Sequence, residues 1–561
     1  MQRGAWRSAL WTALALAACG GGGEAGEGDS PEMQPADGDM LVVGIPTDLD
    51  TMFPPKSESV ASSDVYGGNI YWYLMRSEPD FIHFRPGLAD SFRFTEDSLS
   101  VDFFIHPGIT WHDGHAFTAA DVIFAQGVCK APEINWSAAS WLDHITDVQA
   151  LDSLTVRYTF DERYMYQVLD ANVCYPLPEH ILGDVPLAEM ENHSIARAPV
   201  GNGPFRFVSW TPGQEVVLEA NPDFFRGRPH LNRISFQIIP EPTTLATQIQ
   251  SGTIDLWPRF SHSFYPQLEA TPDLTVHSYQ GRSYTYLAWN TQEPMLQDKA
   301  IREALTMAID RGQIVEALLY GQGTVGTQPL ISTIWAHDPM IEPVPFAADR
   351  ARQMLESAGW VDGDGDGIRE KNGQKLSFEL STNADNTLRV DIVTIIQSQL
   401  KDVGVEVRPN VMEFNTFIDK LLAKDFQAAV GGWSVGIKAE LTPTFGTGEL
   451  FNFVSADNPR LNDLIQQAEV ERDMERAKRI WSEAQRLIVD EAYYTFLFQQ
   501  NDLHVINDRF QNVDMNAYGW GFNLDEWFVP EGLQKYNVPV GASPFAAAGE
   551  SGTEETGAAG R

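Results

Sequence analysis

Amphipathic helical segments alternate with short apolar strands along most of this chain. Residues 473–489, DMERAKRIWSEAQRLIV, carry apolar side chains at helical spacing. Residues 298–310 repeat that pattern, whereas 376–380 (LSFEL) and 405–409 (VEVRP) have the length and composition of strands. The alternation predicts an α/β fold in which these helices serve core packing. The stripe of the first helix consists of Met474, Ala477, Ile480, Trp481, Ala484, Leu487 and Ile488.

The length of the chain requires more than one hydrophobic core. Its 561 residues exceed the size at which a single core stops growing, so two or three domains are expected. Hydrophobic residues make up 43% of the chain, which is enough to fill large cores. The sequence therefore predicts a multidomain globular protein.

The first 18 residues have the pattern of an export signal. Arg3 and Arg7 precede an apolar run that is too short to remain as a membrane-spanning helix. Its end, LAAC, resembles a bacterial lipobox, which implies cleavage before Cys19 and lipidation of the Cys19 thiol. The alternative is an ordinary signal peptide with a chance cysteine. Residues 19–39 are rich in glycine, acidic residues and proline, as suits a flexible tether.

The two ends of the chain indicate where the body resides. No later segment is apolar enough to cross a bilayer, and residues 541–561 are small, polar and expected to be disordered. We expect an exported, lipid-anchored protein that faces the periplasm or the outer side of the cytoplasmic membrane.

Acidic residues strongly outnumber basic ones. The chain has 77 acidic and 39 basic residues, for a formal net charge of −38. Such a surface repels phosphate backbones and anionic lipid headgroups. Nucleic acid is therefore excluded as a partner, and membrane contact is expected only through the lipid on Cys19.

Two cysteines remain after Cys19. In an oxidising compartment Cys129 and Cys174 can pair, and equally both can be small buried hydrophobic residues. The sequence leaves these two alternatives open.

Residues 110–125, TWHDGHAFTAADVIFA, contain the strongest candidate for chemistry. His112, Asp113 and His115 are a hypothetical catalytic or metal-binding cluster of an exported hydrolase or metalloenzyme. No HExxH, CxxC or GxSxG motif accompanies them. Asp113 followed by glycine makes a turn, and Thr118 with Asp121 makes a helix N-terminus. We therefore interpret the stretch as a structural corner, with no enzyme activity, metal or cofactor.

The stretch VDGDGDGIREKNGQ resembles the start of an EF-hand loop. Asp362, Asp364 and Asp366 precede Gly367, but Gly373 stands at the twelfth position, where a bidentate glutamate belongs. A surface turn is the preferred interpretation, and weak calcium binding is the alternative.

A series of segments resembles the family 5 extracellular solute-binding proteins, the peptide, oligopeptide and nickel receptors of bacterial ABC importers. The first, PGLADSFRFTEDSLSVDFFIHPGITWHDGHAFTAADVIFA, contains the corner described above. Together the segments cover nearly the whole body in the order and spacing of the family. They are residues 86–125, 176–185, 200–256, 287–323, 348–360 and 452–498.

The resemblance implies a two-lobed periplasmic-binding-protein fold (class II, cluster C-like) with an extra subdomain inserted in the first lobe. A solute binds in the cleft between the lobes of such proteins. The implied limits are residues 40–80, 199–285 and 496–540 for the first lobe, 81–198 for the inserted subdomain, and 286–495 for the second lobe.

The resemblance also implies how a peptide binds. In peptide receptors an extended ligand pairs its main chain with a short edge from each lobe. The second-lobe edge matches Gly432, Trp433 and Ser434, and the first-lobe edge loosely matches Ser57 to Val60, which includes Glu58 and Ser59. The aromatic residue of an EW-x-TF motif falls on Phe414. Trp433 and Phe414 are alternatively ordinary core aromatics, although Gly431 before Gly432 indicates a close backbone approach.

The sequence departs from the peptide receptors where they bind the charged ends of a peptide. Their aspartate three residues after the tryptophan is Gly436 here, and the nearest following acid is Glu440. The basic residue that some relatives carry before Gly-Trp is Val430. The cargo is therefore a free peptide held by Glu440 in a remodelled loop, or a blocked peptide, a sugar or another organic solute.

The expected function is that of a monomeric solute-binding receptor of an ABC importer. Binding of a peptide-like solute draws the two lobes together by hinge closure, and a permease in the cytoplasmic membrane reads the closed shape. The rival interpretations are the exported enzyme and a receptor-like protein without a transporter.

Overall fold

The computed structural model describes residues 34–541. The predicted signal peptide, Cys19, most of the predicted tether and all but the first residue of the predicted tail lie outside this range. Within the described range no helix is both long and apolar enough to cross a bilayer.

One 11-stranded sheet runs through the molecule in the order β17-β16-β18-β12-β19-β11-β1-β10-β9-β8, with β13 paired to β19. It mixes parallel pairs, such as β1 with β10 and β16 with β17, with antiparallel ones. Its strands are β1 (Met40–Ile45), β8 (Phe205–Thr211), β9 (Glu215–Ala220), β10 (Arg233–Ile238), β11 (Leu256–Trp257), β12 (Leu274–Trp289), β13 (Gly323–Val325), β16 (Ser377–Asn383), β17 (Glu406–Met412), β18 (Ala428–Ser434) and β19 (Tyr494–Asn507).

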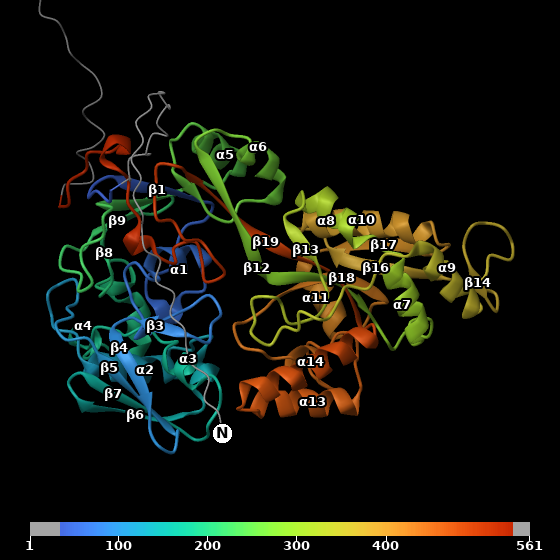
Figure 1. Cartoon of the computed structure of the whole chain (residues 1–561), viewed down its shortest axis with the longest axis horizontal. Coiled ribbons are helices and arrows are strands. Elements are labelled where there is room, and N and C mark those ends of the chain that lie inside the picture. The colour runs from blue at the N-terminus through green and yellow to red at the C-terminus, as the bar shows by residue number, and fades with distance from the viewer. Residues whose placement is uncertain (1–33, 542–561) are drawn as a thin grey trace, which may run out of the picture.

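The two longest strands, β12 and β19, join two lobes (Figure 1). They pair antiparallel from Leu274 opposite Asn507 to Ala288 opposite Tyr494. Their register shifts between Gln280 and Tyr284, which marks a bulge midway along the crossing. Because these two extended strands alone carry the sheet from one lobe to the other in the described part of the chain, the crossing can act as a hinge.

The first lobe contains β1 and β8–β11 together with α1 (Val60–Tyr66), α5 (Pro242–Gln250) and α6 (Tyr265–Glu269). Apolar residues on one face of β1 join a core that continues into the inserted subdomain, and Val42 on the other face packs with α5 in a smaller core. The alternation of burial between the faces follows from the two-residue period of a strand.

The inserted subdomain is built on a four-stranded antiparallel sheet of order β4-β5-β7-β6. A disulfide joins Cys129 in its helix α2 to Cys174, so the two cysteines whose pairing was left open are bonded. Its elements, with the adjoining hairpin, are β2 (Met75–Ser77), β3 (Phe84–Pro86), β4 (Ala89–Phe94), β5 (Ser100–Ile105), β6 (Ile145–Asp152), β7 (Thr155–Phe160), α2 (Ala119–Lys130), α3 (Gln167–Ala171) and α4 (Glu179–Leu182).

The second lobe has two separate hydrophobic cores, one on each face of the sheet. The predicted helical stripe lies on α14, where Ala477, Trp481, Ala484 and Ile488 are buried. Its further elements are α7 (Lys299–Met307), α8 (Arg311–Leu319), α9 (Ala348–Ser357), β14 (Glu370–Lys371), β15 (Gln374–Lys375), α10 (Thr387–Lys401), α11 (Phe414–Leu422), α12 (Thr442–Phe445), α13 (Pro459–Val470) and α14 (Met474–Asp490).

The predicted α/β, two-lobed architecture is confirmed. The exact limits remain predictions. Residue 81 lies in the turn between β2 and β3, and the limits 285/286 and 495/496 fall inside β12 and β19, because the crossing strands belong to both lobes.

Candidate ligand-binding cleft

The corner around His112 is held by the backbone. Gly201 N–H donates to His112 Nδ1 at 3.2 Å, and Nε2–H donates to the Gly203 carbonyl at 3.0 Å. Both ring nitrogens are therefore engaged in a neutral imidazole, and burial lowers the pKa of His112 to about 4. A metal ligand or general base needs a free lone pair, which this imidazole lacks.

The other two corner residues pair with a histidine that the sequence did not single out. His180 Nε2 lies 2.8 Å from Asp113 Oδ2, and the His180 ring stacks on His115 with centroids 4.0 Å apart. Thr118 caps α2 in the predicted capping box with Asp121. These contacts give the corner residues the structural tasks that the preferred interpretation expects, and the absence of enzyme activity stays a prediction.

A cavity of about 560 Å³ lies between the first lobe, the inserted subdomain and the loop after β18. Its wall is aromatic and charged, and Tyr73 stacks on Tyr175 with centroids 3.8 Å apart. The size is that of a small-molecule or short-peptide site. Its aromatic and charged lining residues are Glu58, Asp64, Trp72, Tyr73, Arg76, Phe81, Trp141, Tyr175, Arg259, Arg282, Tyr518, Trp520 and Phe522.

The segment from Ser57 to Val60 lines this cavity but is not a strand edge. The backbone N–H groups of Glu58 and Ser59 donate to the Asp50 carboxylate at 2.7 and 3.0 Å. Ser59 then caps α1, which begins at Val60. These two amides are already bonded and cannot donate to a ligand. The expectation that the segment pairs with a peptide main chain as a strand edge is therefore wrong for these N–H groups. It contributes side chains to the cavity.

The second-lobe edge lies in β18, as the resemblance implies. Trp433 pairs with Tyr284 of β12, and Gly432 pairs with Thr285. On the other side of β18, pairing with β16 covers only Ala428 and Ala429, so from Gly431 onward the strand has no ladder partner there among residues 34–541. That side is the edge available to a ligand main chain.

A second cavity, of about 430 Å³, adjoins this edge and is lined by Gly432, Trp433, Ser434 and Phe414. Phe414 begins α11 and is 44% exposed, so it is not a core aromatic. The structure thus places the second-lobe residues on one cavity and the first-lobe segment on another.

Trp433 is part of an aromatic stack. Its ring lies nearly parallel to Phe453, with centroids 5.4 Å apart, and to Tyr286 at 6.0 Å. Tyr286 in turn stacks on Tyr494 at 4.3 Å. The stack holds the half-buried indole as a rigid wall of the second cavity.

The predicted close approach at Gly431 and Gly432 is present. A Cβ on Gly431 would lie 2.7 Å from Tyr286 Oη, and one on Gly432 would lie 2.8 Å from Arg389 Nη2. Side chains of the protein, rather than a ligand, make this approach. Arg389 lines the second cavity and is a cation that the sequence reading missed.

The loop that follows the edge reaches the inserted subdomain. Lys438 Nζ lies 2.7 Å from Asp170 Oδ1, and Tyr166 Oη accepts N–H groups from Ala439 at 2.8 Å and from Trp335 Nε1 at 3.1 Å. Glu440 is exposed and lines neither of these cavities. The structure therefore does not bring Glu440 to the position of the missing aspartate.

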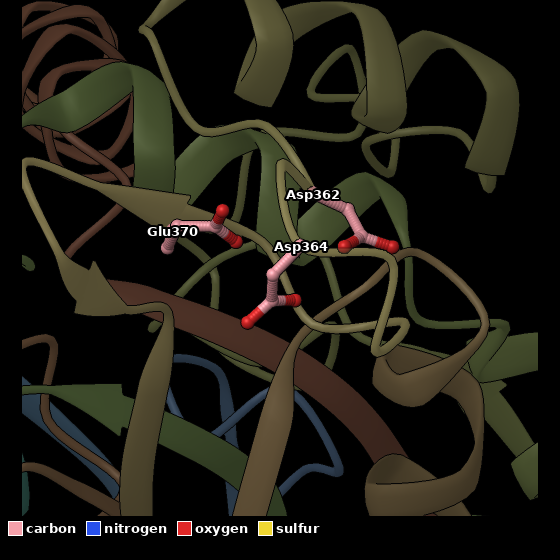
Figure 2. A group of neighbouring side chains, drawn as sticks. All are labelled: Asp362, Asp364 and Glu370. Carbon is pink, nitrogen blue, oxygen red and sulfur yellow. The ribbon is translucent and has the colours of Figure 1, made fainter.

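The Asp- and Gly-rich loop forms a surface turn, the preferred interpretation. Asp362 accepts the N–H groups of Gly365 and Gly367 at 2.7 and 3.0 Å, and Lys375 pairs with Asp366. Figure 2 shows carboxylates of Asp362, Asp364 and Glu370 gathered at the loop. Glu370 lies near the aspartates although the twelfth position of the loop, where the EF-hand pattern places an acid, is Gly373.

Most of the chain matches a known protein family and its members. The family model described as "Bacterial extracellular solute-binding proteins, family 5 Middle" matches residues 83–444. The oligopeptide-binding protein AppA of Bacillus subtilis is 30% identical over 505 residues, which cover 88% of this chain and 92% of that protein. The nickel-binding periplasmic protein of Escherichia coli is 28% identical over 339 residues, 57% of this chain and 62% of that protein.

Solved structures show the same fold. The structure of Bacillus subtilis AppA in complex with a nonapeptide has a TM-score of 0.68 at 29% identity and covers 88% of this chain and 100% of that one. The substrate-binding protein CtaP of Listeria monocytogenes has a TM-score of 0.78 at 22% identity, with coverage of 88% and 100%.

Proposed function

Since the chain belongs to the bacterial extracellular solute-binding proteins of family 5, we propose that it binds a peptide-like solute between its lobes and delivers it to an ABC permease. The observation that carries the proposal is the 560 Å³ interlobe cavity, together with the β18 edge that lines the 430 Å³ cavity. A relative that covers most of the chain is an oligopeptide-binding protein, and its structure holds a nonapeptide.

The proposed ligand contacts are of two kinds. Gly432, Trp433 and Ser434 offer a backbone edge and an aromatic wall, with Phe414 across the same cavity. Glu58, Ser59 and Val60 contribute side-chain contacts from the first lobe. Backbone pairing disregards side-chain identity, so we expect tolerance of many peptide sequences.

The mechanism is a shift in population without chemistry on the solute. Cargo that contacts both lobes binds the closed form more tightly than the open form, and it therefore favours closure. The hinge is the crossing of β12 and β19. The permease then recognises the closed pair of lobes.

Export and anchoring determine where the receptor meets its transporter. We propose that it acts as a monomer, exported and anchored by a lipid on Cys19. A tether of that kind raises the concentration of receptor beside its transporter.

Native mass spectrometry of the purified soluble body tests the function. The protein is analysed as isolated and again after unfolding, refolding and incubation with a mixed library of peptides four to nine residues long. Retained peptide masses in either sample are the expected result. A protein that retains none, and instead retains a sugar or another solute, contradicts the peptide assignment.

A further inference from the structure

Arg282 lies at the hinge and lines the interlobe cavity. It belongs to β12, within the register shift between Gln280 and Tyr284. Its backbone carbonyl accepts the N–H of Val435 at 2.8 Å, which ties it to the loop that follows the second-lobe edge. The residue thus contacts the lobe that must move when the cleft closes.

The guanidinium of Arg282 is available to a ligand. Its side chain is exposed, and within residues 34–541 it forms no hydrogen bond and no ion pair. The Phe81 ring lies beneath it, 5.5 Å from the guanidinium carbon, and Phe81 stacks on Tyr518. This contact holds the planar group in place while its N–H donors remain free.

The other two arginines of the cavity are occupied. Arg259 pairs with Asp64, and Arg76 pairs with Asp525 at 3.5 Å and donates to the Phe522 carbonyl. The protein around the cavity removes part of the hydration of the Arg282 guanidinium and so lowers its pKa, and Asp502 is the first of the charges that oppose this shift. Asp502 lies beyond ion-pair distance and does not line the cavity, so a solute there meets the cation.

We propose that Arg282 binds a carboxylate of the cargo, so that the receptor selects solutes with a free carboxylate. The inference rests on the proposed function and deepens it. A planar guanidinium donates two parallel hydrogen bonds to a carboxylate, a geometry that an amide cannot reproduce. Such an anion bound at the crossing strands, and beside the Val435 contact, couples recognition of the charge to closure.

The charge on Arg282 also bears on the two positions, Val430 and Gly436, where this chain lacks the charged residues of the peptide receptors. The basic residue that the resemblance places before Gly-Trp is absent, and Arg282 supplies a cation from the strand that pairs with that edge. Glu58, which lines the same cavity and has no ion pair among the described residues, leaves room for a cationic group elsewhere on the solute.

Two matched peptide libraries test the proposal. Mixed tetrapeptides with free carboxyl termini are compared with the same tetrapeptides amidated, by calorimetric titration of refolded protein. Wild type should bind the carboxylate library roughly tenfold to a hundredfold more tightly, the range for a hydrogen bond to a charged group. Arg282→Gln should remove this difference, whereas Arg282→Lys should retain part of it.

Arg460→Gln is the control, because Arg460 is an exposed residue of α13 paired with Glu483 and lies outside the cavity. It should keep the wild-type preference. Thermal unfolding of Arg282→Gln should match wild type, since no ion pair is lost. If wild type binds both libraries equally, or Arg282→Gln keeps the preference, the Arg282 proposal is overturned and the peptide function stands. If neither library binds, the peptide function fails as well.

Discussion

Lys438 and Asp170 form an ion pair that joins the second lobe to the inserted subdomain. The Lys438 ammonium lies 2.7 Å from Asp170 Oδ1 and rests 4.5 Å from the centroid of the Trp141 ring. The Asp170 side chain is only 1% exposed. Lys438 directly follows Ile437, which lines the interlobe cavity, so the ion pair joins the two sides of the cleft next to the cavity.

Replacing Lys438 with alanine should favour the open form. A buried Asp170 without its partner costs about 3–5 kcal/mol, and opening rehydrates it, so the cost falls on the closed state. We expect cargo affinity to fall at least tenfold and the radius of gyration of the bound protein to rise. Lys420→Ala, which removes an exposed pair with Asp425, is the matched control. Equal affinities for the two variants would show that the Lys438 contact does not fasten the cleft.

The His112 corner should make stability depend on pH. The folded pKa of about 4 lies below the unfolded value near 6.5, so below pH 6.5 the unfolded chain binds a proton that the folded one does not. The free energy of unfolding should therefore decrease as the pH is lowered below 6.5. At pH 4 this group should have lowered it by roughly 3 kcal/mol relative to neutral pH. His504, whose pKa burial lowers to about 3, acts in the same direction.

Denaturant unfolding of wild type and His112→Asn at pH 7 and pH 4.5 isolates the His112 contribution. The variant should lose less stability on acidification and should still bind cargo at pH 7. Loss of cargo binding with an unchanged melting temperature would instead show that His112 contributes to ligand binding and is not a purely structural residue.

Gly431 should tolerate no side chain. Tyr286 is stacked between Trp433 and Tyr494, so its ring cannot move away from a Cβ that would lie 2.7 Å from its hydroxyl. Gly431→Ala should destabilise the protein by about 1–3 kcal/mol, the usual cost of overpacking. Gly436→Ala is the control, because a Cβ there meets nothing within 4 Å. Equal melting temperatures for the two variants would exclude the tight fit.

The disulfide between Cys129 and Cys174 should contribute to stability. It closes a loop with a sequence separation of 45 residues, and its removal restores freedom to the unfolded chain. Replacing both cysteines with serine should lower the free energy of unfolding by about 2–4 kcal/mol. A reducing agent should have the same effect on wild type and none on the double variant. A wild type insensitive to reduction would argue against the bond.

Local sequence signals predicted local structure well. Thr118 and Asp121 specified the start of α2, and the stripe that contains Trp481 specified α14, because caps and periodicity act within a few residues. Placement of the Gly432–Trp433 edge came from resemblance alone.

Long-range pairings were not predictable from the sequence. Nothing near His115 indicates His180, and nothing near Gly436 indicates that Lys438 meets Asp170, 268 residues away. Ser57 to Val60 was expected to be an edge, but Asp50 takes its amides, a local contact that a motif match does not reveal. The sequence did not predict a role for Arg282, because that role depends on its side chain having no ion-pair partner among residues 34–541, which only the folded chain shows.

Small-angle X-ray scattering of the refolded protein, before and after addition of the tightest-binding peptide from the library, tests trapping of a solute by closure most directly. The account predicts that the radius of gyration falls on binding and that the curve of the bound protein matches the structure described above. Superimposable curves with peptide bound at saturation would contradict it.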